Sequence, residues 1–367
     1  MATSSQHYYF LINSLEAWGA ERVVTNLSRQ LIDQWHQVDI ITLKDQVFYD
    51  LPEWVSYRPL LQSSSNLLMV LMIPYLIWKV KKTLKREHYD SGVSFLELAN
   101  FIHIRARKNT IISLRNSIAS FRGLKWSLYK YFIKRLYPRA QTIIVNSEEN
   151  RHDIAQYLDI SLDQVQTIYN PIDLTEVKRL SSEPIDPSLT QSASGKKIYI
   201  TVGRLTKLKS QDKILRGLAQ LPRDDRVLRV LWDGPERVRL ERLSHQLWIA
   251  EQVYFLGRQE NVFAYLDKAD LFLYASEAEW FPNALIEALA CGLPIITSHF
   301  KTWAQEVILW DYERDRMLQY PVYGPNGVLI DPDRYAEQLV QVVQDPDKIE
   351  QQQQGLEKFI NTRVFFI

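Results

Sequence analysis

The chain has 367 residues, of which 46% are hydrophobic and 24% are charged, and its formal net charge is +1. This length exceeds what one hydrophobic core usually serves, so two domains are expected, and the near-neutral charge argues against a nucleic-acid binder that neutralises phosphates. The single cysteine, Cys291, excludes an internal disulfide and any multi-thiolate metal site, and it favours a reducing, cytoplasmic location.

The first residues are not typical of an exported protein. Met1 to His7 are polar and lead directly into the apolar run Tyr8–Ile12, without the basic start and long apolar core of a secretory signal. The longest apolar stretch, Leu67–Trp78, contains Pro74 and is too short to span roughly 30 Å of hydrocarbon. We therefore expect neither export nor a transmembrane helix.

Short β-branched or aromatic runs alternate with longer helical patterns, which is typical of βαβ units around a parallel sheet. In the first half the expected strands are Tyr8–Ile12, Val38–Thr42, Asp90–Phe95, Thr110–Leu114, Thr142–Asn146 and Val165–Tyr169. In the second half they are Ile198–Val202, Val227–Leu231, Gln252–Phe255, Leu271–Tyr274 and Pro294–Thr297.

The segment between the two halves, SSEPIDPSLTQSASGKK, is rich in Ser and Pro and has no apolar periodicity. The sequence therefore predicts an α/β protein with two doubly wound domains, residues 1–180 and 198–350, joined by a linker at 181–197. A helical tail, 351–367, is expected to pack back on the first domain.

The window Glu277–Thr297, EAEWFPNALIEALACGLPIIT, is the most informative one. A strand ends and a helix starts at Pro282, and Gly292 closes the helix. Glu287 lies in the middle of this apolar helix, and burying a lone carboxylate costs several kcal/mol unless a partner satisfies it. Glu279 comes just before the helix, whose free N–H groups point toward the same crevice. The alternative is that Glu287 pairs with an internal Arg and Glu279 is solvated.

Two further windows follow the first strand of each half. Gly203 and Arg204, with Lys209 shortly after, place a glycine and two cations where they can clamp phosphates, or they are ordinary surface charge. Gly19, in Trp18-Gly19-Ala20-Glu21-Arg22, opens the first helix and can bring amides toward a phosphate. Without a full GxGxxG it does not by itself support a dinucleotide site, and taken alone it is better interpreted as a plain tight turn.

Several common site motifs are absent from the sequence. A P-loop, a GxSxG elbow, an HExxH and paired cysteines are all missing, which disfavours NTPases, α/β-hydrolases and zinc enzymes. Asp331-Pro332-Asp333 and Asp345-Pro346-Asp347 fit D-x-D formally, but each contains Pro and lies far from a strand, so both are interpreted as turns. No metal site is expected.

Together these windows resemble the large retaining glycosyltransferase family 4, which has the GT-B fold. The resemblance spans most of the chain through the following segments, in the family's order: GAERVVTNLSRQL, VNSEENRHDI, IYNPID, VGRLTKLKSQDKIL, LWDGPERVRLERL, VYFLGRQENV and EWFPNALIEALACGLPIIT. It implies two Rossmann-like domains that face each other across a cleft, with the nucleotide held mostly by the second one.

The resemblance also implies roles for individual residues. Glu287 would bind the donor ribose, Glu279 the transferred sugar, and Arg204 with Lys209 the diphosphate, which suits a leaving group that gains negative charge. The remaining donor-binding positions that it implies are Gly19, Gly203, Arg258, Phe281, Pro282 and Asn283. The donor is a nucleotide-diphosphate sugar, with UDP favoured, and no metal or other cofactor is implied.

The chain departs from the family pattern at several positions. Trp18 replaces the first of two usual glycines, Trp280 replaces the glycine of E-G-F-P, and Ser210 replaces the glycine that often follows the lysine. Where many relatives have a histidine on a first-domain loop, this chain has Arg115 and Asn116, which thus become candidates for contacting donor or acceptor. His103 is interpreted as an ordinary helix or loop residue.

Two segments combine apolar and basic residues: 67–86, and 122–139. Each is either a crossover helix with solvated lysines or a helix that lies on an anionic membrane surface. In the second case the protein is peripheral on the inner face of the cytoplasmic membrane and its acceptor is a polyprenyl-linked saccharide or glycolipid.

The sequence thus favours a retaining glycosyltransferase that moves a hexose or N-acetylhexosamine to a saccharide or lipid-linked saccharide in surface glycan biosynthesis. Two alternatives stay open. One is a catalytically inactive GT-B partner or binding subunit, which the tryptophans at expected glycine positions motivate. The other is a nucleotide-sugar epimerase on the same fold.

Overall fold

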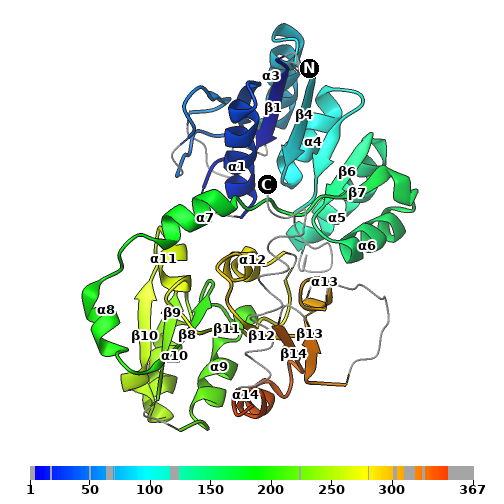
Figure 1. Cartoon of the computed structure of the whole chain (residues 1–367). Helices are drawn as coiled ribbons and strands as arrows, with labels where there is room; N and C mark the ends of the chain where they lie inside the picture. The colour runs from blue at the N-terminus through cyan, green and yellow to red at the C-terminus, as the bar shows by residue number, and fades with distance from the viewer. Residues whose placement is uncertain are drawn as a thin grey trace. The chain divides into compact units, whose positions relative to one another are not determined.

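The computed structural model describes residues 5–16, 19–48, 51–62, 69, 71–115, 124–222, 225–279, 281–300, 304–309, 319–324 and 327–345. The chain divides into two compact units, Met1–Pro171 and Ile172–Ile367 (Figure 1). The Ser- and Pro-rich segment 181–197 therefore falls inside the second unit, where it contains the short helix α8, Pro187–Ser192. The expected tail 351–367 and the second acidic triplet beyond Asp345 lie outside the described residues.

The first unit is built on a seven-stranded parallel sheet in the order β3-β2-β1-β4-β5-β6-β7. Its strands are β1 His7–Ile12, β2 Gln37–Thr42, β3 Ser56–Pro59, β4 Ser91–Phe95, β5 Ile111–Ser113, β6 Thr142–Val145 and β7 Val165–Thr167. Every strand expected in this half is present. The short edge strand β3 was not predicted, because its sequence, SYRP, has no apolar run.

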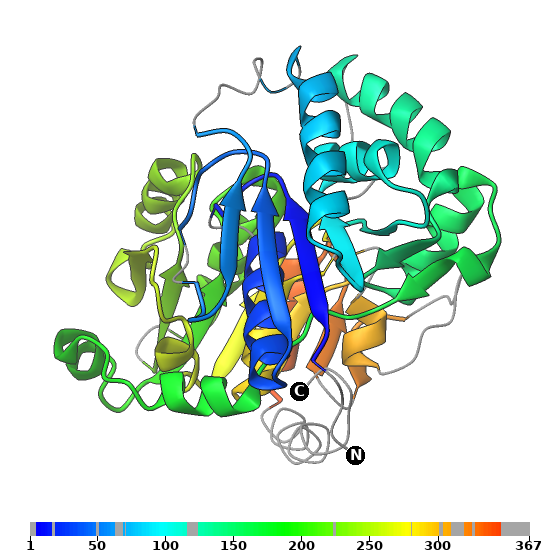
Figure 2. The ribbon, with the colours of Figure 1, turned by 90° about the horizontal axis from the view of Figure 1, so that it is seen from above.

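Helices cover both faces of this sheet. They are α1 Gly19–Asp33, α3 Ile73–Arg86, α4 Glu97–Ala106, α5 Leu124–Leu136 and α6 Glu148–Leu158, with 3-10 turns η1 Tyr137–Arg139 and η2 Leu162–Gln164. Alternate residues of β1 point to opposite faces, as the two-residue period of a strand requires. Tyr9 and Leu11 pack in one cluster with α3 and α4, whereas Phe10 and Ile12 pack in another with α1. Helices α3 and α4 lie side by side (Figure 2).

The second unit contains another seven-stranded sheet, in the order β10-β9-β8-β11-β12-β14-β13 (Figure 1). Its strands are β8 Lys197–Val202, β9 Arg226–Leu231, β10 Val253–Gly257, β11 Leu271–Tyr274, β12 Ile295–Ser298, β13 Val322–Gly324 and β14 Gly327–Ile330. All pairs are parallel except β13 with β14. The sequence did not predict β13 and β14, since each apolar run is too short to show a period.

The helices of this unit surround a core that β8, β9, β11 and α9 share with α10 and α14. They are α7 Leu174–Ser181, α8, α9 Gln211–Leu218, α10 Arg237–Gln246, α11 Phe263–Leu266, α12 Asn283–Ala290, α13 Ala304–Ile308 and α14 Tyr335–Val343, with 3-10 turns η3 Lys207–Lys209 and η4 Ala250–Gln252. The triplet that starts at Asp331 forms a turn, as expected: Asp331 accepts the Asp333 N–H and the Arg334 N–H.

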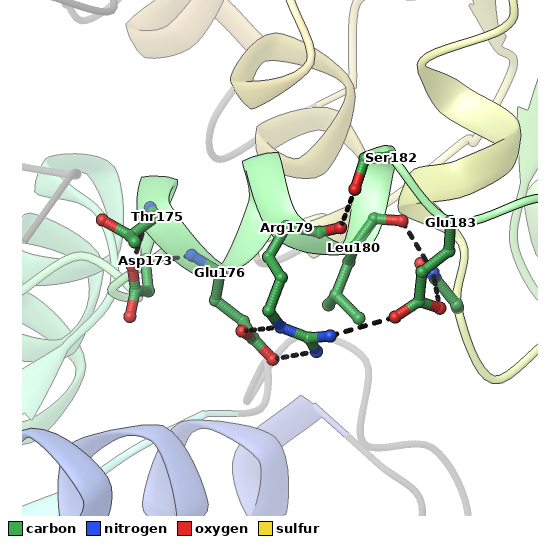
Figure 3. Close-up of polar contacts among 8 residues, drawn as sticks. Asp173, Thr175, Glu176, Arg179, Leu180, Ser182 and Glu183 are labelled. Atoms are coloured by element: carbon green, nitrogen blue, oxygen red, sulfur yellow. Dashed lines mark hydrogen bonds and ion pairs between the residues drawn. The ribbon is translucent and has the colours of Figure 1, made fainter.

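Helix α7 is the first element of the second unit, and its own polar residues stabilise it (Figure 3). The Asp173 carboxylate caps its start by accepting the N–H groups of Thr175 and Glu176 at 2.8 and 3.1 Å. Arg179 then bridges Glu176 and Glu183 along one exposed side. Contacts from within its own sequence therefore support α7, and the Asn261 side chain adds to them by donating to the Leu180 carbonyl at 2.8 Å.

Candidate active site

Both sheets have a topological switch point, where the chain direction across the sheet reverses. It lies between β1 and β4 in the first unit and between β8 and β11 in the second. Ligands of doubly wound sheets bind outside the carboxyl ends of the strands at this point. The segments that follow these four strands are therefore where a site is expected in each unit.

In the second unit a lysine and a glutamate meet at this point. Lys209, at the end of η3, forms an ion pair with Glu279, and its Nζ donates to the Tyr274 hydroxyl at 2.7 Å. The Tyr274 hydroxyl in turn donates to Glu279 Oε1 at 2.9 Å, and Ser276 Oγ donates to the same oxygen at 2.8 Å. The Glu279 side chain is only 14% exposed, so it is not a solvated loop residue.

Tyr274 is the centre of this cluster. Its pKa is raised well above the usual value, first by burial and then by the carboxylates of Glu279 and Glu287. The hydroxyl therefore stays protonated and acts as a donor to Glu279 while it accepts from Lys209. Gly203 lies beside Lys209 and Tyr274: a Cβ added there would meet their side chains at 3.9 to 4.0 Å.

The loop that carries Lys209 is docked on the loop that carries Glu279. The Leu208 carbonyl accepts the Glu277 N–H at 2.9 Å, and the Ser276 hydroxyl lies 3.2 Å from the same carbonyl. Ser210, at φ 48°, adopts the left-handed backbone that ends η3 and starts α9, and its hydroxyl lies 3.1 Å from Glu277 Oε1. This conformation explains why a glycine is common at the position of Ser210 in the family that the sequence resembles.

Glu287 lies within α12 and is buried, as the apolar pattern around it predicts. The helix starts at Asn283 with Pro282 as its cap residue, and it ends at the left-handed Gly292. Phe281 is buried directly before the helix, and Asn283 is half-buried in its first turn. Four of the residues expected around the donor, Phe281, Pro282, Asn283 and Glu287, therefore lie on or directly before one helix.

Two further cations were expected at the site. Arg204 directly follows Gly203 and is exposed. Arg258, directly after β10, lies over the Trp232 ring at 5.3 Å from its centroid. Because β9 lies between β10 and β8, this places Arg258 further along the same edge of the sheet.

At the switch point of the first unit, one oxygen of a buried carboxyl has no hydrogen-bond partner among the described residues. Glu21, in the first turn of α1, is 3% exposed, and its Oε2 has no hydrogen-bond partner among the described residues. Burial raises its pKa to about 7. Nearby, Lys44 after β2 pairs with Glu16 after β1 at 2.6 Å. Gly19, which starts α1, is exposed.

Arg115 follows β5 on the same edge. Its guanidinium donates to the Ser113 hydroxyl at 2.7 Å and to the Asn170 side chain, and it lies 5.4 Å from the centre of the Phe95 ring. Burial lowers its pKa to about 10. Asn116 lies outside the described residues.

His103 is fully buried in α4, where its ring is hydrogen-bonded to Tyr9 and Ser94, and burial lowers its pKa to about 3. It is therefore an uncharged residue of the core, in line with its interpretation as an ordinary helix residue.

The sequence pointed to Lys209, Glu279 and Glu287 but assigned no role to Tyr274, Ser276 or Glu21. Tyr274 ends an apolar strand shortly before Ser-Glu-Ala-Glu, so the polar hydroxyl at the end of a buried strand was the available signal.

Among the described residues no three His, Cys, Asp or Glu side chains gather closely enough to hold a metal ion. Within those same ranges, no helix has the length and apolar character needed to span a bilayer.

Comparison with known proteins gives two family matches. The model described as "Glycosyl transferases group 1" matches residues 184–358, and the model described as "Glycosyltransferase Family 4" matches residues 18–176.

Two relatives from Campylobacter jejuni are similar over most of their length. One, an N-acetylgalactosamine-N,N'-diacetylbacillosaminyl-diphospho-undecaprenol 4-alpha-N-acetylgalactosaminyltransferase, is 31% identical over 306 residues, which cover 81% of each chain. The other, a GalNAc-alpha-(1->4)-GalNAc-alpha-(1->3)-diNAcBac-PP-undecaprenol alpha-1,4-N-acetyl-D-galactosaminyltransferase, is 26% identical over 82% of this chain and 81% of its own length.

Solved structures share the fold at lower identity. Anabaena HepE in complex with UDP superposes with a TM-score of 0.72 at 18% identity and covers 96% of this chain and 94% of its own. WaaG, a glycosyltransferase involved in lipopolysaccharide biosynthesis, gives 0.70 at 18% identity, with 98% and 96% covered. Together with the two parallel-rich sheets, these likenesses identify the GT-B fold with its two Rossmann-like domains.

Proposed function

Because the chain belongs to glycosyltransferase family 4 and is a glycosyltransferase, we propose that it transfers a hexose or N-acetylhexosamine from a UDP-sugar, with retention of configuration, to a lipid-linked saccharide. The observation that carries the donor side of this proposal is the cluster of Lys209, Glu279 and Tyr274 at the switch point of the second unit. UDP in the HepE complex supports the choice of nucleotide.

Lys209 would stabilise the departing diphosphate. A nucleoside diphosphate gains negative charge as the glycosidic bond breaks, and a cation that is already held in place needs no reorganisation at that moment. The Glu279 carboxylate and the Tyr274 hydroxyl hold the Lys209 ammonium in this way. Arg204 and the amides near Gly203 and Gly19 would add to the positive field without a metal ion.

Glu279 and Glu287 would bind the sugar part of the donor. An ionised carboxylate accepts hydrogen bonds from hydroxyl groups, so Glu279 suits the transferred sugar and the buried Glu287 suits the ribose. The nucleotide would lie along Phe281, Pro282, Asn283 and Arg258, and the second domain would thus hold the donor, as the resemblance implies.

Arg115 and Asn116 would contact the acceptor or donor from the first domain. The described part of this pair, Arg115, is held between Ser113 and Asn170 at the carboxyl ends of the strands.

The surface of α3 supports a lipid-linked acceptor. The exposed Leu71 lies two residues before the helix, and the exposed positions Tyr75, Trp78, Lys82 and Lys85 recur every three or four residues and so follow one face of it. The first three are 71%, 41% and 55% exposed, which places aromatic and aliphatic side chains next to lysines, as on a helix that lies in a headgroup layer.

Helix α5, which like α3 packs against α4, repeats the pattern. Its exposed residues include Leu128, Tyr131 and Phe132, with Lys134 and Arg135 following. We infer that these two helices hold the enzyme peripherally on the inner face of the cytoplasmic membrane. The two Campylobacter relatives are named for undecaprenyl-linked substrates, which agrees with this position.

A transfer assay with matched lysine variants tests the proposal. Lys209→Ala should lower transfer by about 10²–10³-fold, the effect of removing a preorganised electrostatic contact. Lys213→Ala is the control, because Lys213 pairs with the half-exposed Glu277, and it should stay within about twofold. Equal losses in both variants would contradict the proposed role of Lys209.

Product analysis separates the remaining alternatives. Transfer of labelled sugar to a lipid-linked saccharide supports the proposal, and conversion of the donor without acceptor would instead indicate an epimerase. Titration with UDP should show binding, since a partner subunit with an inactive site would bind none.

Vesicles with anionic lipids should recruit the protein, and replacing Tyr75 and Trp78 with Ser should abolish that recruitment while leaving UDP binding intact.

A further inference from the structure

Tryptophan occupies backbone positions that favour glycine. Among the described residues, nine residues other than glycine have positive φ, and four of these are tryptophans: Trp35, Trp54, Trp232 and Trp248. Their φ values are 67°, 74°, 105° and 59°. Positive φ is uncommon for any side chain with a Cβ and is an outlier for a bulky one. Four coincidences in one chain therefore call for a common cause.

Trp35 and Trp248 end helices in the way that glycine usually does. After α1, the Trp35 N–H donates to Ile32 at 2.8 Å and the next N–H donates to Leu31 at 2.9 Å. After α10, Trp248 donates to His245 and the next N–H donates to Ser244, both at 3.0 Å. This pair of hydrogen bonds is the Schellman motif, whose left-handed residue is most often glycine.

Gly292 gives the matched case in the same chain. At the end of α12 its N–H donates to Leu289 at 2.9 Å and the next N–H donates to Ala288 at 3.0 Å, with φ 73°. The hydrogen bonds are the same as at Trp35 and Trp248, and here the residue is glycine.

Trp54 and Trp232 have different reasons to require glycine. Trp54 is the third residue of a turn closed by the Val55 N–H on the Pro52 carbonyl at 3.3 Å, the position that a type II turn gives to glycine. Trp232 follows β9 at φ 105°, well beyond the left-handed helical region, and its N–H donates to the Gly257 carbonyl at 2.6 Å.

Packing does not offset this backbone cost at three of these positions. The side chains of Trp35, Trp54 and Trp248 are 86%, 87% and 78% exposed. Buried apolar area is what would stabilise a strained tryptophan, and these indoles bury little of it.

The amino-acid composition also indicates that tryptophan stands where glycine is expected. The chain has 12 glycines and 10 tryptophans, whereas average usage of about 7% glycine would give about 26 glycines in a chain of this length. Trp18 and Trp280 also stand where the sequence motifs suggest glycine.

We propose that the source organism inserts glycine at residues 18, 35, 54, 232, 248 and 280. The codon UGA is read as tryptophan in some genetic codes and as glycine in others, so one codon assignment accounts for all six positions. Trp78 differs from these six positions because it lies within α3, where glycine would be unfavourable, so we expect it to be tryptophan in the native protein.

Glycine at residue 232 also changes the donor site, and this part rests on the proposed function. A glycine at 232 removes the indole that lies 5.3 Å from Arg258. The glycine form should therefore admit a nucleotide sugar more readily than the tryptophan form.

The coding sequence and the native protein test the codon assignment directly. We expect UGA at the six positions and UGG at Trp78. Peptide mass spectrometry of the protein isolated from its source should show glycine at residue 248. UGG codons at these positions, or tryptophan in that peptide, would overturn the proposal.

Stability measurements test the structural part independently of any activity. Changing Trp35, Trp54, Trp232 and Trp248 to Gly should raise the folding equilibrium constant by about fivefold at each position, seen as a higher urea midpoint. The reverse change, Gly292→Trp, and the helix change, Trp78→Gly, should both lower the midpoint. A lower midpoint for the four-glycine variant would overturn the structural argument.

Activity is measured last, on the full chain with all six glycines. Tighter UDP binding than in the tryptophan form supports the inference about the donor site. A gain in stability without any UDP binding in either form would keep the glycine assignment and reject the proposed function.

Discussion

The two sheets share one strand order around their first strand, yet the buried glutamates at their switch points have different surroundings. In the second unit the charges are paired, because Lys209 and Glu279 form an ion pair that Tyr274 supports. In the first unit the buried Glu21 carboxyl has an oxygen with no partner among the described residues. The fold therefore fixes where a ligand binds, and a few side chains decide what binds there.

The difference has an energetic consequence. A carboxylate that accepts hydrogen bonds from a cation and two hydroxyls keeps its charge at low cost, whereas a buried carboxyl without such donors is disfavoured when it ionises. The second unit thus offers a preformed charged site. The first unit offers a carboxyl whose protonation state changes near neutral pH.

The largest expected effect concerns the paired site. Glu279→Gln keeps the shape of the side chain but removes the charge that holds the Lys209 ammonium, so transfer should fall by about 10²-fold. Steady-state kinetics should assign most of the loss to kcat. Glu277→Gln is the control, because its pair with Lys213 is half-exposed, and comparable loss in the control would argue against a specific pair.

The next effect concerns the unpaired site. The folded-state pKa of Glu21 is about 7, above its ordinary value of 4.5, so the folded protein loses stability as pH rises through this interval. Glu21→Gln does not titrate and should gain about 3 kcal/mol at pH 8 relative to the original chain.

Urea unfolding at several pH values measures the Glu21 effect. The gain should shrink toward zero near pH 4, where the original carboxyl is protonated in both the folded and the unfolded state. Glu16→Gln serves as the control, since that side chain is 41% exposed and paired with Lys44. A gain that does not depend on pH would show that ionisation of Glu21 is not the cause.

The comparison also shows what a sequence can and cannot predict. The long β-branched runs predicted eleven strands, each of which is present, because a buried parallel strand must be apolar on both faces. The three strands that were not predicted are three or four residues long. Length is not the reason, since β5 and β7 are also three residues long and were predicted. Strands β3 and β13 are edge strands without an apolar run, so their pairing and not their own sequence makes the strand.

The sites divide in a similar way. Glu279 and Lys209 were found because each is a charged residue beside a strand end, and the fold brings them together. Tyr274 was not assigned, because a tyrosine in an apolar strand is indistinguishable by pattern from a core residue. Its role depends on its position at the end of the strand and on two partners, Lys209, which is 65 residues before it in the chain, and Glu279, which is 5 residues after it.

A smaller effect is expected at Arg115 in the first unit. Arg115→Met keeps the length of the side chain but leaves the Ser113 hydroxyl and the Asn170 side chain without the guanidinium. The loss of these hydrogen bonds should cost about 1–3 kcal/mol in the free energy of unfolding. Thermal unfolding measures it, and Arg135→Met on the exposed face of α5 should change little.

The smallest effect concerns Ser210, which joins the loop of Lys209 to that of Glu279. Ser210→Gly removes the cost of left-handed backbone but also removes a hydroxyl that lies 3.1 Å from Glu277. Each term is on the order of 1 kcal/mol, so they should nearly cancel. Ser210→Ala keeps the backbone cost and loses the hydroxyl, so it should lower the free energy of unfolding by about 1 kcal/mol. Equal stability of the two variants would mean that the left-handed backbone carries no cost here, and the same reasoning would then fail at Trp35 and Trp248.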